Sequence, residues 1–140
     1  QREASEGQLE WNVKRILSKV NYRIHTDAVK AHLIPPLLDS SKQGKVYAIE
    51  ADVLNKALFG KCAAEWRKEN PGRKGNIRDD ATIEQLTVLA SLESQNALLI
   101  EQGVPQLERL KLLNRLAIQQ MQSILQSSSL EALKTKALLE

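Results

Sequence analysis

The chain has 140 residues, of which 42% are hydrophobic and 26% charged, and its formal net charge is +3. This length suffices for one domain with a buried core. Six glycines, four prolines and 4% aromatic residues are too few for a β-sandwich or barrel, which needs many turns and β-branched or aromatic strands. We therefore expect a single all-α domain over residues 1–140.

The charge and cysteine counts exclude some functions and leave others open. Twenty basic residues oppose 17 acidic ones, so the surplus permits contact with nucleic acid without requiring it. The single cysteine, Cys62, excludes an internal disulfide and fits a reducing compartment. No apolar run approaches the ~20 residues that span a bilayer, and no signal peptide opens the chain, so we expect no membrane contact. The first residue is Gln1, which predicts a piece of a longer protein.

The first third of the chain predicts two helices with a break between them. Ser5 and Gln8 have capping-box spacing. Apolar residues then recur at helical intervals at Leu9, Val13, Ile16, Leu17 and Val20. We expect a break at residues 21–25, a new N-cap at Thr26, and a stop at Pro35 and Pro36.

The middle of the chain predicts a loop followed by two short helices. Residues 35–45 form the expected loop, and residues 46–49 a short extended piece. Asp52 is expected to cap a helix that ends at Gly60, and a second helix follows from Ala63 to Pro71. Two short helices joined at a glycine resemble a helix-turn-helix unit, a pattern that is common in all-α proteins.

The last third predicts a long helical hairpin. Thr82 and Gln85 form a capping box, and the stripe that follows, through Ile100, is wide enough to pack on two sides. Gly103 and Pro105 then link this helix to a second one, which makes the pair antiparallel. Residues 127–140 are expected to form a flexible tail or an extra short helix. The expected fold is thus an irregular multi-helix bundle with a long C-terminal hairpin.

The apolar faces of this hairpin are broader than one small domain covers, which favours homo-oligomerisation. Burial inside one domain is the alternative reading. The interface candidates are Leu112, Leu116, Leu130 and Leu138.

The chain carries no strong catalytic or metal motif, so we predict no cofactor and no small-molecule substrate. His25 and His32 are seven residues apart, but the expected break removes their common face. Cys62 fits a buried apolar position better than a nucleophile. Asp79 and Asp80 could hold a divalent ion in a nuclease, although acids before a helix have the same pattern.

A basic cluster is the most informative local feature. Its members fall within 23 residues, on and between the two expected short helices and in the loop that follows them. Such residues can hold phosphates and reach base edges. A solvated surface, partly neutralised by Glu65 and Glu69, is the alternative. The candidate nucleic-acid-binding residues are Lys56, Lys61, Arg67, Lys68, Arg73, Lys74, Asn76 and Arg78.

Three stretches resemble the C-terminal half of bacterial KilA-N domain proteins, which are chromosomal or phage-derived. They are LEWNVKRILSKVNYRIHTDAVK (Leu9–Lys30), ADVLNKALFGKCAAEWRKENP (Ala51–Pro71) and GNIRDDATIEQLTVLASLESQNALLIEQG (Gly75–Gly103). The resemblance covers residues 8–125 and implies a KilA-N domain before Gln1 that supplies the DNA binding of the family. More distantly, LNKALFGKCAAEW (Leu54–Trp66) is similar to a helix-turn-helix-like phrase of phage antirepressors.

The sequence and the resemblance together predict a non-catalytic, cytoplasmic bacterial domain. It would help a DNA-binding protein to assemble or to contact partners, with auxiliary phosphate contacts from the basic cluster. A metal-dependent nuclease that uses Asp79 and Asp80 is the alternative.

Overall fold

The computed structural model describes residues 2–126, apart from the side chains of residues 2–6, 10, 11, 14, 15 and 17. The tail predicted at 127–140, with Leu130 and Leu138, lies outside this range. The described residues form helices and no strand, as the composition predicts. The elements are α1 (Arg2–Leu33), α2 (Ser40–Phe59), α3 (Ala63–Glu69), the 3-10 helix η1 (Ile77–Asp80), α4 (Ile83–Glu101) and α5 (Gln106–Leu125).

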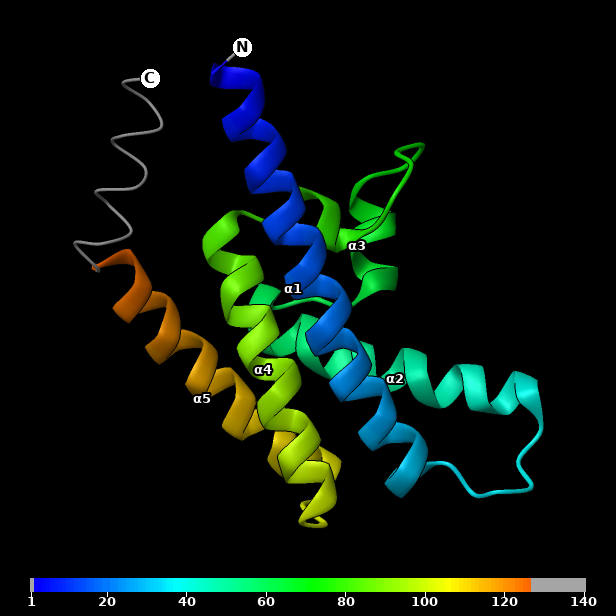
Figure 1. The fold of residues 1–140 in the computed structure, drawn as a ribbon. Coiled ribbons are helices and arrows are strands. Elements are labelled where there is room, and N and C mark those ends of the chain that lie inside the picture. The colour runs from blue at the N-terminus through cyan, green and yellow to red at the C-terminus, as the bar shows by residue number, and fades with distance from the viewer. Residues whose placement is uncertain (1, 127–140) are drawn as a thin grey trace.

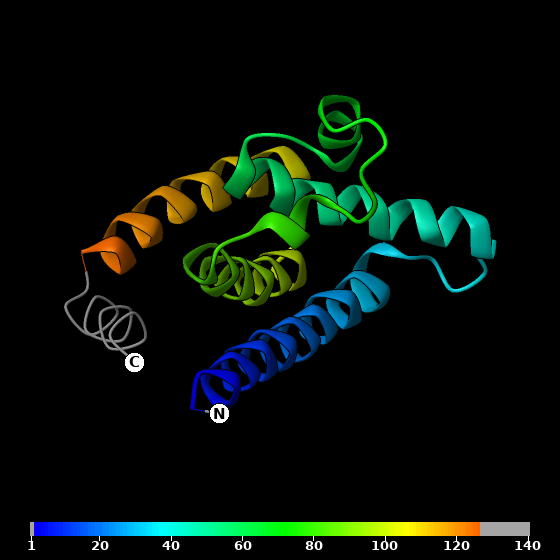
Figure 2. The same ribbon diagram turned by 90° about the horizontal axis from the view of Figure 1, so that it is seen from above.

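The helices form three layers, with α4 in the middle (Figure 1). Seen from above, α1 lies on one side of α4, while α2 and α5 lie on the other (Figure 2). The prediction that this helix packs on two sides is therefore confirmed. α1 forms an outer layer, with no other described helix on its far side (Figure 2). No helix of the described residues is long and apolar enough to cross a membrane.

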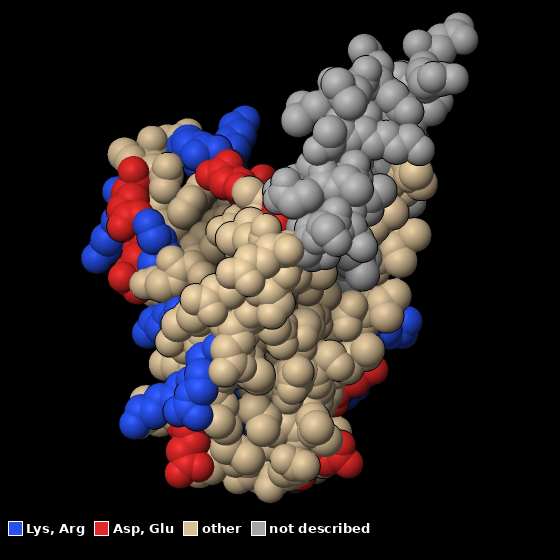
Figure 3. Space-filling view, turned by 90° about the vertical axis from the view of Figure 1, so that its left-hand side faces the viewer, with Lys and Arg blue, Asp and Glu red and all other residues tan. Residues whose placement is uncertain are grey.

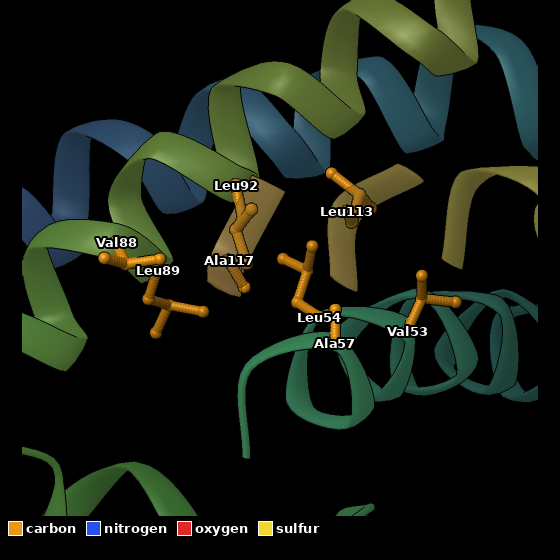
Figure 4. Packing of buried hydrophobic residues seen from close by; sticks show 8 residues of the cluster. All are labelled: Val53, Leu54, Ala57, Val88, Leu89, Leu92, Leu113 and Ala117. Atoms are coloured by element: carbon orange, nitrogen blue, oxygen red, sulfur yellow. The ribbon is translucent and has the colours of Figure 1, made fainter. Parts of the chain in front are cut away.

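The main core lies between α2, α4 and α5 (Figure 4). Leu54, Leu92 and Leu113, one from each helix, are completely buried there. Burying a leucine side chain stabilises a fold by about 1.5–3 kcal/mol, so these three helices hold one another in place. The other buried members are Val53, Ala57, Val88, Leu89 and Ala117.

The hairpin of α4 and α5 has the boundaries that the sequence predicts. The Thr82 amide donates to Gln85 Oε1 (2.9 Å), and the Gln85 amide donates to Thr82 Oγ1 (3.1 Å). This reciprocal pair satisfies backbone donors that the first turn leaves without partners. Gly103 has a φ of 75° and ends the turn after α4, and Pro105 stands at the N-cap of α5.

The predicted break at residues 21–25 is wrong, because α1 continues through it to Leu33. Thr26 does not cap a helix. Its hydroxyl donates to the Arg23 carbonyl oxygen (3.2 Å), which satisfies the side chain inside the helix. His25 and Val29 are one turn apart and both buried, so packing against the rest of the fold keeps the helix intact across the polar stretch.

The predicted loop and extended piece at 40–49 are also wrong, because α2 begins at Ser40. Buried Glu50, Val53, Leu54 and Ala57 follow helical spacing, and half-buried Val46 extends this pattern backwards. Asp52 consequently lies inside α2 and does not begin a helix. Its Oδ1 accepts a hydrogen bond from the Ala63 amide (2.9 Å), so Asp52 stabilises the start of α3 instead.

Candidate functional site

Two members of the predicted nucleic-acid-binding cluster are held by exposed carboxylates. Lys61 forms an ion pair with Glu69. Arg73 Nη2 lies 2.6 Å from Asp80 Oδ1, and its guanidinium stands 5.5 Å from the centre of the Trp66 ring. Both pairs are local and partly exposed, so they reduce the charge available to a phosphate without removing it.

Arg78 is half-buried and contacts buried side chains of α2 and α4. Its Nη1 lies 3.8 Å from Glu93 Oε2, and its Nε donates to Asn55 Oδ1 (3.4 Å). Asn76 also forms two local hydrogen bonds. Its Oδ1 accepts from the backbone amide of Arg78 (2.8 Å), and its backbone amide donates to Asp79 Oδ2 (2.7 Å). Asn76 therefore caps η1, and its side-chain oxygen is already used.

The remaining four members of the cluster are exposed and form no ion pair with any described residue. Lys56 lies in the last turn of α2, Arg67 and Lys68 lie in the last turn of α3, and Lys74 lies in the following loop. Figure 3 shows that basic and acidic side chains stand next to each other on one face of the molecule, around a broad uncharged centre. The cationic surface is thus defined by Lys56, Arg67, Lys68 and Lys74.

The two carboxylates of the nuclease alternative are occupied by donors of the chain. Asp79 accepts from the Asn76 amide, and Asp80 accepts from Arg73. Within the described part of the chain, no group of three or more His, Cys, Asp or Glu side chains could hold a metal ion. Cys62 stands at the N-cap of α3 and is half-buried, so the prediction of a buried position for this cysteine is wrong.

Because α1 is continuous, His25 and His32 lie two turns apart on one helix, contrary to the prediction. Their surroundings nevertheless differ. His25 is buried, with an exposed fraction of 3%, whereas His32 is exposed. His25 belongs to a buried polar network that sequence reasoning missed.

This buried network joins four helices. The guanidinium of Arg109 from α5 binds Glu50 of α2 through two hydrogen bonds (2.5 and 3.1 Å). Arg109 also donates to Asn96 Oδ1 of α4 (2.9 Å), and the Asn96 amide nitrogen lies 2.8 Å from Nε2 of His25 in α1. Gln106 donates to the second oxygen of Glu50 (2.8 Å). Bidentate arginine–carboxylate pairs are strong and directional, so the network fixes how the layers align.

The network also defines the protonation states of its members. Because Asn96 Oδ1 accepts from Arg109, its nitrogen faces His25, and Nε2 of that ring must accept. Burial lowers the pKa of His25 to about 4, so the ring is neutral at pH 7. Burial opposes ionisation of Glu50, but hydrogen bonds from Arg109, Gln106 and Asn96 outweigh it and lower the Glu50 pKa.

A cavity of about 620 Å³ lies between α1, the η1 segment and α4. Glu93 forms part of its wall with 2% of its surface exposed, and its Oε2 accepts no hydrogen bond from a described residue. Burial raises the pKa of Glu93 to about 7, against the opposing effect of Arg78. The carboxyl is therefore partly protonated near neutral pH, which lowers the cost of keeping it inside.

The outer helix α1 has an apolar stripe that no described helix covers. Leu9, Val13, Ile16 and Val20 are 64%, 40%, 57% and 53% exposed. We call these four residues the α1 stripe. Of the interface leucines predicted from sequence, Leu112 is 36% exposed, and Leu116 is half-buried and packs against the core. That interface stays a prediction.

We compared the chain with protein-family models, with curated proteins and with solved structures, and none of them matches it.

Proposed function

We propose that this chain is a non-catalytic helical domain of a KilA-N-type DNA-binding protein, and that it serves assembly or partner interaction. The observation that supports assembly is the α1 stripe, in which four large apolar side chains of one helix are each at least 40% exposed. Single exposed apolar residues are ordinary, but a continuous row of them marks an interaction surface.

The position of the stripe supports this proposal further. His25 and Val29 use another face of the same helix for packing inside the domain. The second apolar face of this 32-residue helix exposes apolar surface to solvent, and only another molecule or another segment can cover it. We do not extend the proposal to a nuclease, because Asp79 and Asp80 already accept hydrogen bonds from the chain.

Assembly is tested by the mass of the protein in solution over a wide range of concentration. We expect the wild-type mass to rise with concentration and Ile16→Lys to abolish the rise, because a charge would be buried in the contact. Leu37→Lys is the matched control, since Leu37 is fully exposed in the loop before α2. A wild-type protein that stays monomeric at the highest concentration would refute assembly.

A second activity, binding to DNA phosphates, is supported by the cationic surface, whose four residues lack an ion pair with any described residue. Replacing Lys56, Arg67, Lys68 and Lys74 by alanine should weaken DNA binding. The slope of the logarithm of the binding constant against the logarithm of the salt concentration should become shallower by about 0.9 for each phosphate that the protein no longer neutralises. A variant with alanine at Lys30, Lys42, Lys45 and Lys111 has the same net charge and should bind more tightly than the first. Equal effects in both variants, or no binding at low salt, would contradict this activity.

A further inference from the structure

The α1 stripe has the spacing of a seam between two helices. Its members are separated by four, three and four residues, which is the spacing of the apolar positions in a coiled coil. At about 100° per residue, all four lie within ~60° of one another around the helix, and buried His25 and Val29 lie on the opposite side. The stripe therefore points away from the interior, and a second helix can reach it without displacing α4 (Figure 2).

The stripe is symmetric about a point between Lys14 and Arg15. Leu9 and Val20 are equally far from this point, and so are Val13 and Ile16. Two copies of α1 in antiparallel orientation would therefore place Leu9 against Val20 of the second copy, and Val13 against Ile16. All four stripe residues of each copy would be covered, which is the self-complementarity that a two-fold interface requires.

The charges that continue the seam have the same symmetry. Extending the four-and-three spacing outward reaches Arg23 and Asp27 at one end, and positions 6 and 2 at the other, where the sequence has Glu and Arg. Antiparallel copies bring position 6 opposite position 23 and position 2 opposite position 27, so each layer joins opposite charges. A parallel pair would bring each residue opposite its own copy, with like charges together.

We infer that α1 binds α1 of a second copy of this chain in antiparallel orientation, with the α1 stripe as the seam and Arg23 and Asp27 in the charged layers at its ends. The inference rests on the proposed role in assembly and names the partner. A helix that binds an anionic membrane would favour basic residues along both margins of the stripe. A helix that binds an unrelated helix would not need a charge pattern that becomes complementary to itself when the helix direction is reversed. The palindromic charge pattern therefore selects a second copy.

Disulfide cross-linking in a Cys62→Ser background tests the orientation. Leu9→Cys and Val20→Cys proteins are prepared separately and oxidised alone and as an equimolar mixture. Antiparallel pairing predicts cross-linked dimers in the mixture, which carry one chain of each kind. Each variant alone should stay uncross-linked, because the same position in two antiparallel copies is separated by about eleven residues along the axis, ~16 Å, beyond the reach of a disulfide.

Charge reversal tests the ends of the seam. Arg23→Glu should weaken the dimer about three- to tenfold, because it would lie opposite Glu6 of the second copy at both ends. Adding Glu6→Arg to the same chain should restore the affinity, and Lys42→Glu, which makes the same change of charge on α2, should leave it unaltered.

The outcomes separate the inference from the proposed function. If Ile16→Lys abolishes the dimer but the Leu9→Cys protein cross-links to itself, the antiparallel arrangement is overturned, while assembly through α1 still stands. Failure of Glu6→Arg to rescue Arg23→Glu also overturns the arrangement. A strictly monomeric wild-type protein overturns both.

Discussion

Arg109 lies on the buried face of α5, four residues before Leu113, and its guanidinium makes four hydrogen bonds in the described structure. Two of these reach Glu50, one reaches Asn96, and one, from Nε, reaches the Val104 carbonyl oxygen (2.9 Å). Removing one partner of such a pair leaves a buried charge without compensation, and this cost exceeds the net contribution of the intact pair.

Arg109→Met should therefore destabilise the protein by about 3–5 kcal/mol, because Glu50 would remain buried without its cation. Urea unfolding followed by circular dichroism measures this as a lower midpoint. The double variant Glu50→Gln/Arg109→Met should be more stable than Arg109→Met alone, because no carboxylate is then left unpaired. A loss below about 1 kcal/mol for the single variant would indicate that water already reaches Glu50.

His25 and Glu93 make opposite contributions to the dependence of stability on pH. The His25 pKa is about 4 in the folded protein and 6.5 for a free histidine, so its contribution is present above 6.5 and is lost as the pH falls toward 4. The Glu93 pKa is about 7 when folded and 4.5 when free, so its contribution is complete below 4.5 and is lost as the pH rises toward 7. Between 4.5 and 6.5 the two effects oppose each other.

Single substitutions should separate these effects. Glu93→Gln removes the Glu93 effect, so relative to wild type its free energy of unfolding should rise with pH from about 4.5 to 7. His25→Gln keeps an acceptor for Asn96 but removes the His25 effect, so relative to wild type its free energy of unfolding should fall as the pH rises from about 4 to 6.5. Chemical unfolding at several pH values measures both slopes. Parallel curves for wild type and both variants would show that neither group titrates as the structure indicates.

At the scale of the helices, local signals predicted the boundaries that depend on neighbouring residues. The Thr82–Gln85 capping box, Gly60 and Gly103 each act through backbone geometry within a few residues, so the sequence displays them directly. The continuity of α1 and the start of α2 at Ser40 depend on which faces become buried against distant helices. Packing overrides weak local propensities there, and a single stretch of sequence does not contain that information.

Gly44 inside α2 and Gly60 at its C-cap provide a matched test of these helix signals. Gly60 has a φ of 77° at the end of the helix, a conformation that favours glycine, so Gly60→Ala should destabilise the protein by about 1 kcal/mol. Gly44 lies within the same helix, and a Cβ added there would meet nothing within 4 Å. Gly44→Ala should therefore stabilise the protein by up to about 1 kcal/mol. Thermal unfolding of both variants provides the comparison, and a change of the same sign in both would contradict it.

The candidate site was predictable only in part, for a related reason. The eight residues of the predicted basic cluster are close in sequence, and Arg73 pairs locally with Asp80, but the carboxylate next to Arg78 is Glu93, which comes from α4. The buried network joins residues up to 71 positions apart, which no local motif reveals. One signal was present: Glu50, Asn96 and Arg109 occupy helical positions in register with buried apolar neighbours, where a polar residue needs a partner from another helix.

In the whole molecule, the layered arrangement separates the buried interior from the exposed α1 stripe. α4 is covered on both sides, by α1 and by α2 with α5, whereas the described helices cover α1 on one side only. Closure of the domain therefore does not use the α1 stripe, and substitutions there should alter association without unfolding the monomer. The buried network, in contrast, joins all three layers, so substitutions in it should affect the fold first.

The inferred dimer makes thermal stability depend on protein concentration, because only the folded chain presents a continuous α1 stripe. Above the dissociation constant, each tenfold increase in concentration adds RT ln 10, about 1.4 kcal/mol, shared by two protomers. For a chain of this length, that raises the Tm by about 2 °C. Differential scanning calorimetry over a roughly hundredfold range measures the shift. Leu37→Lys should keep this dependence, whereas Ile16→Lys should remove it while retaining the wild-type Tm at low concentration. A wild-type Tm that does not change with concentration would refute the dimer, and an Ile16→Lys variant with a lower Tm at every concentration would show that the stripe supports the monomer instead.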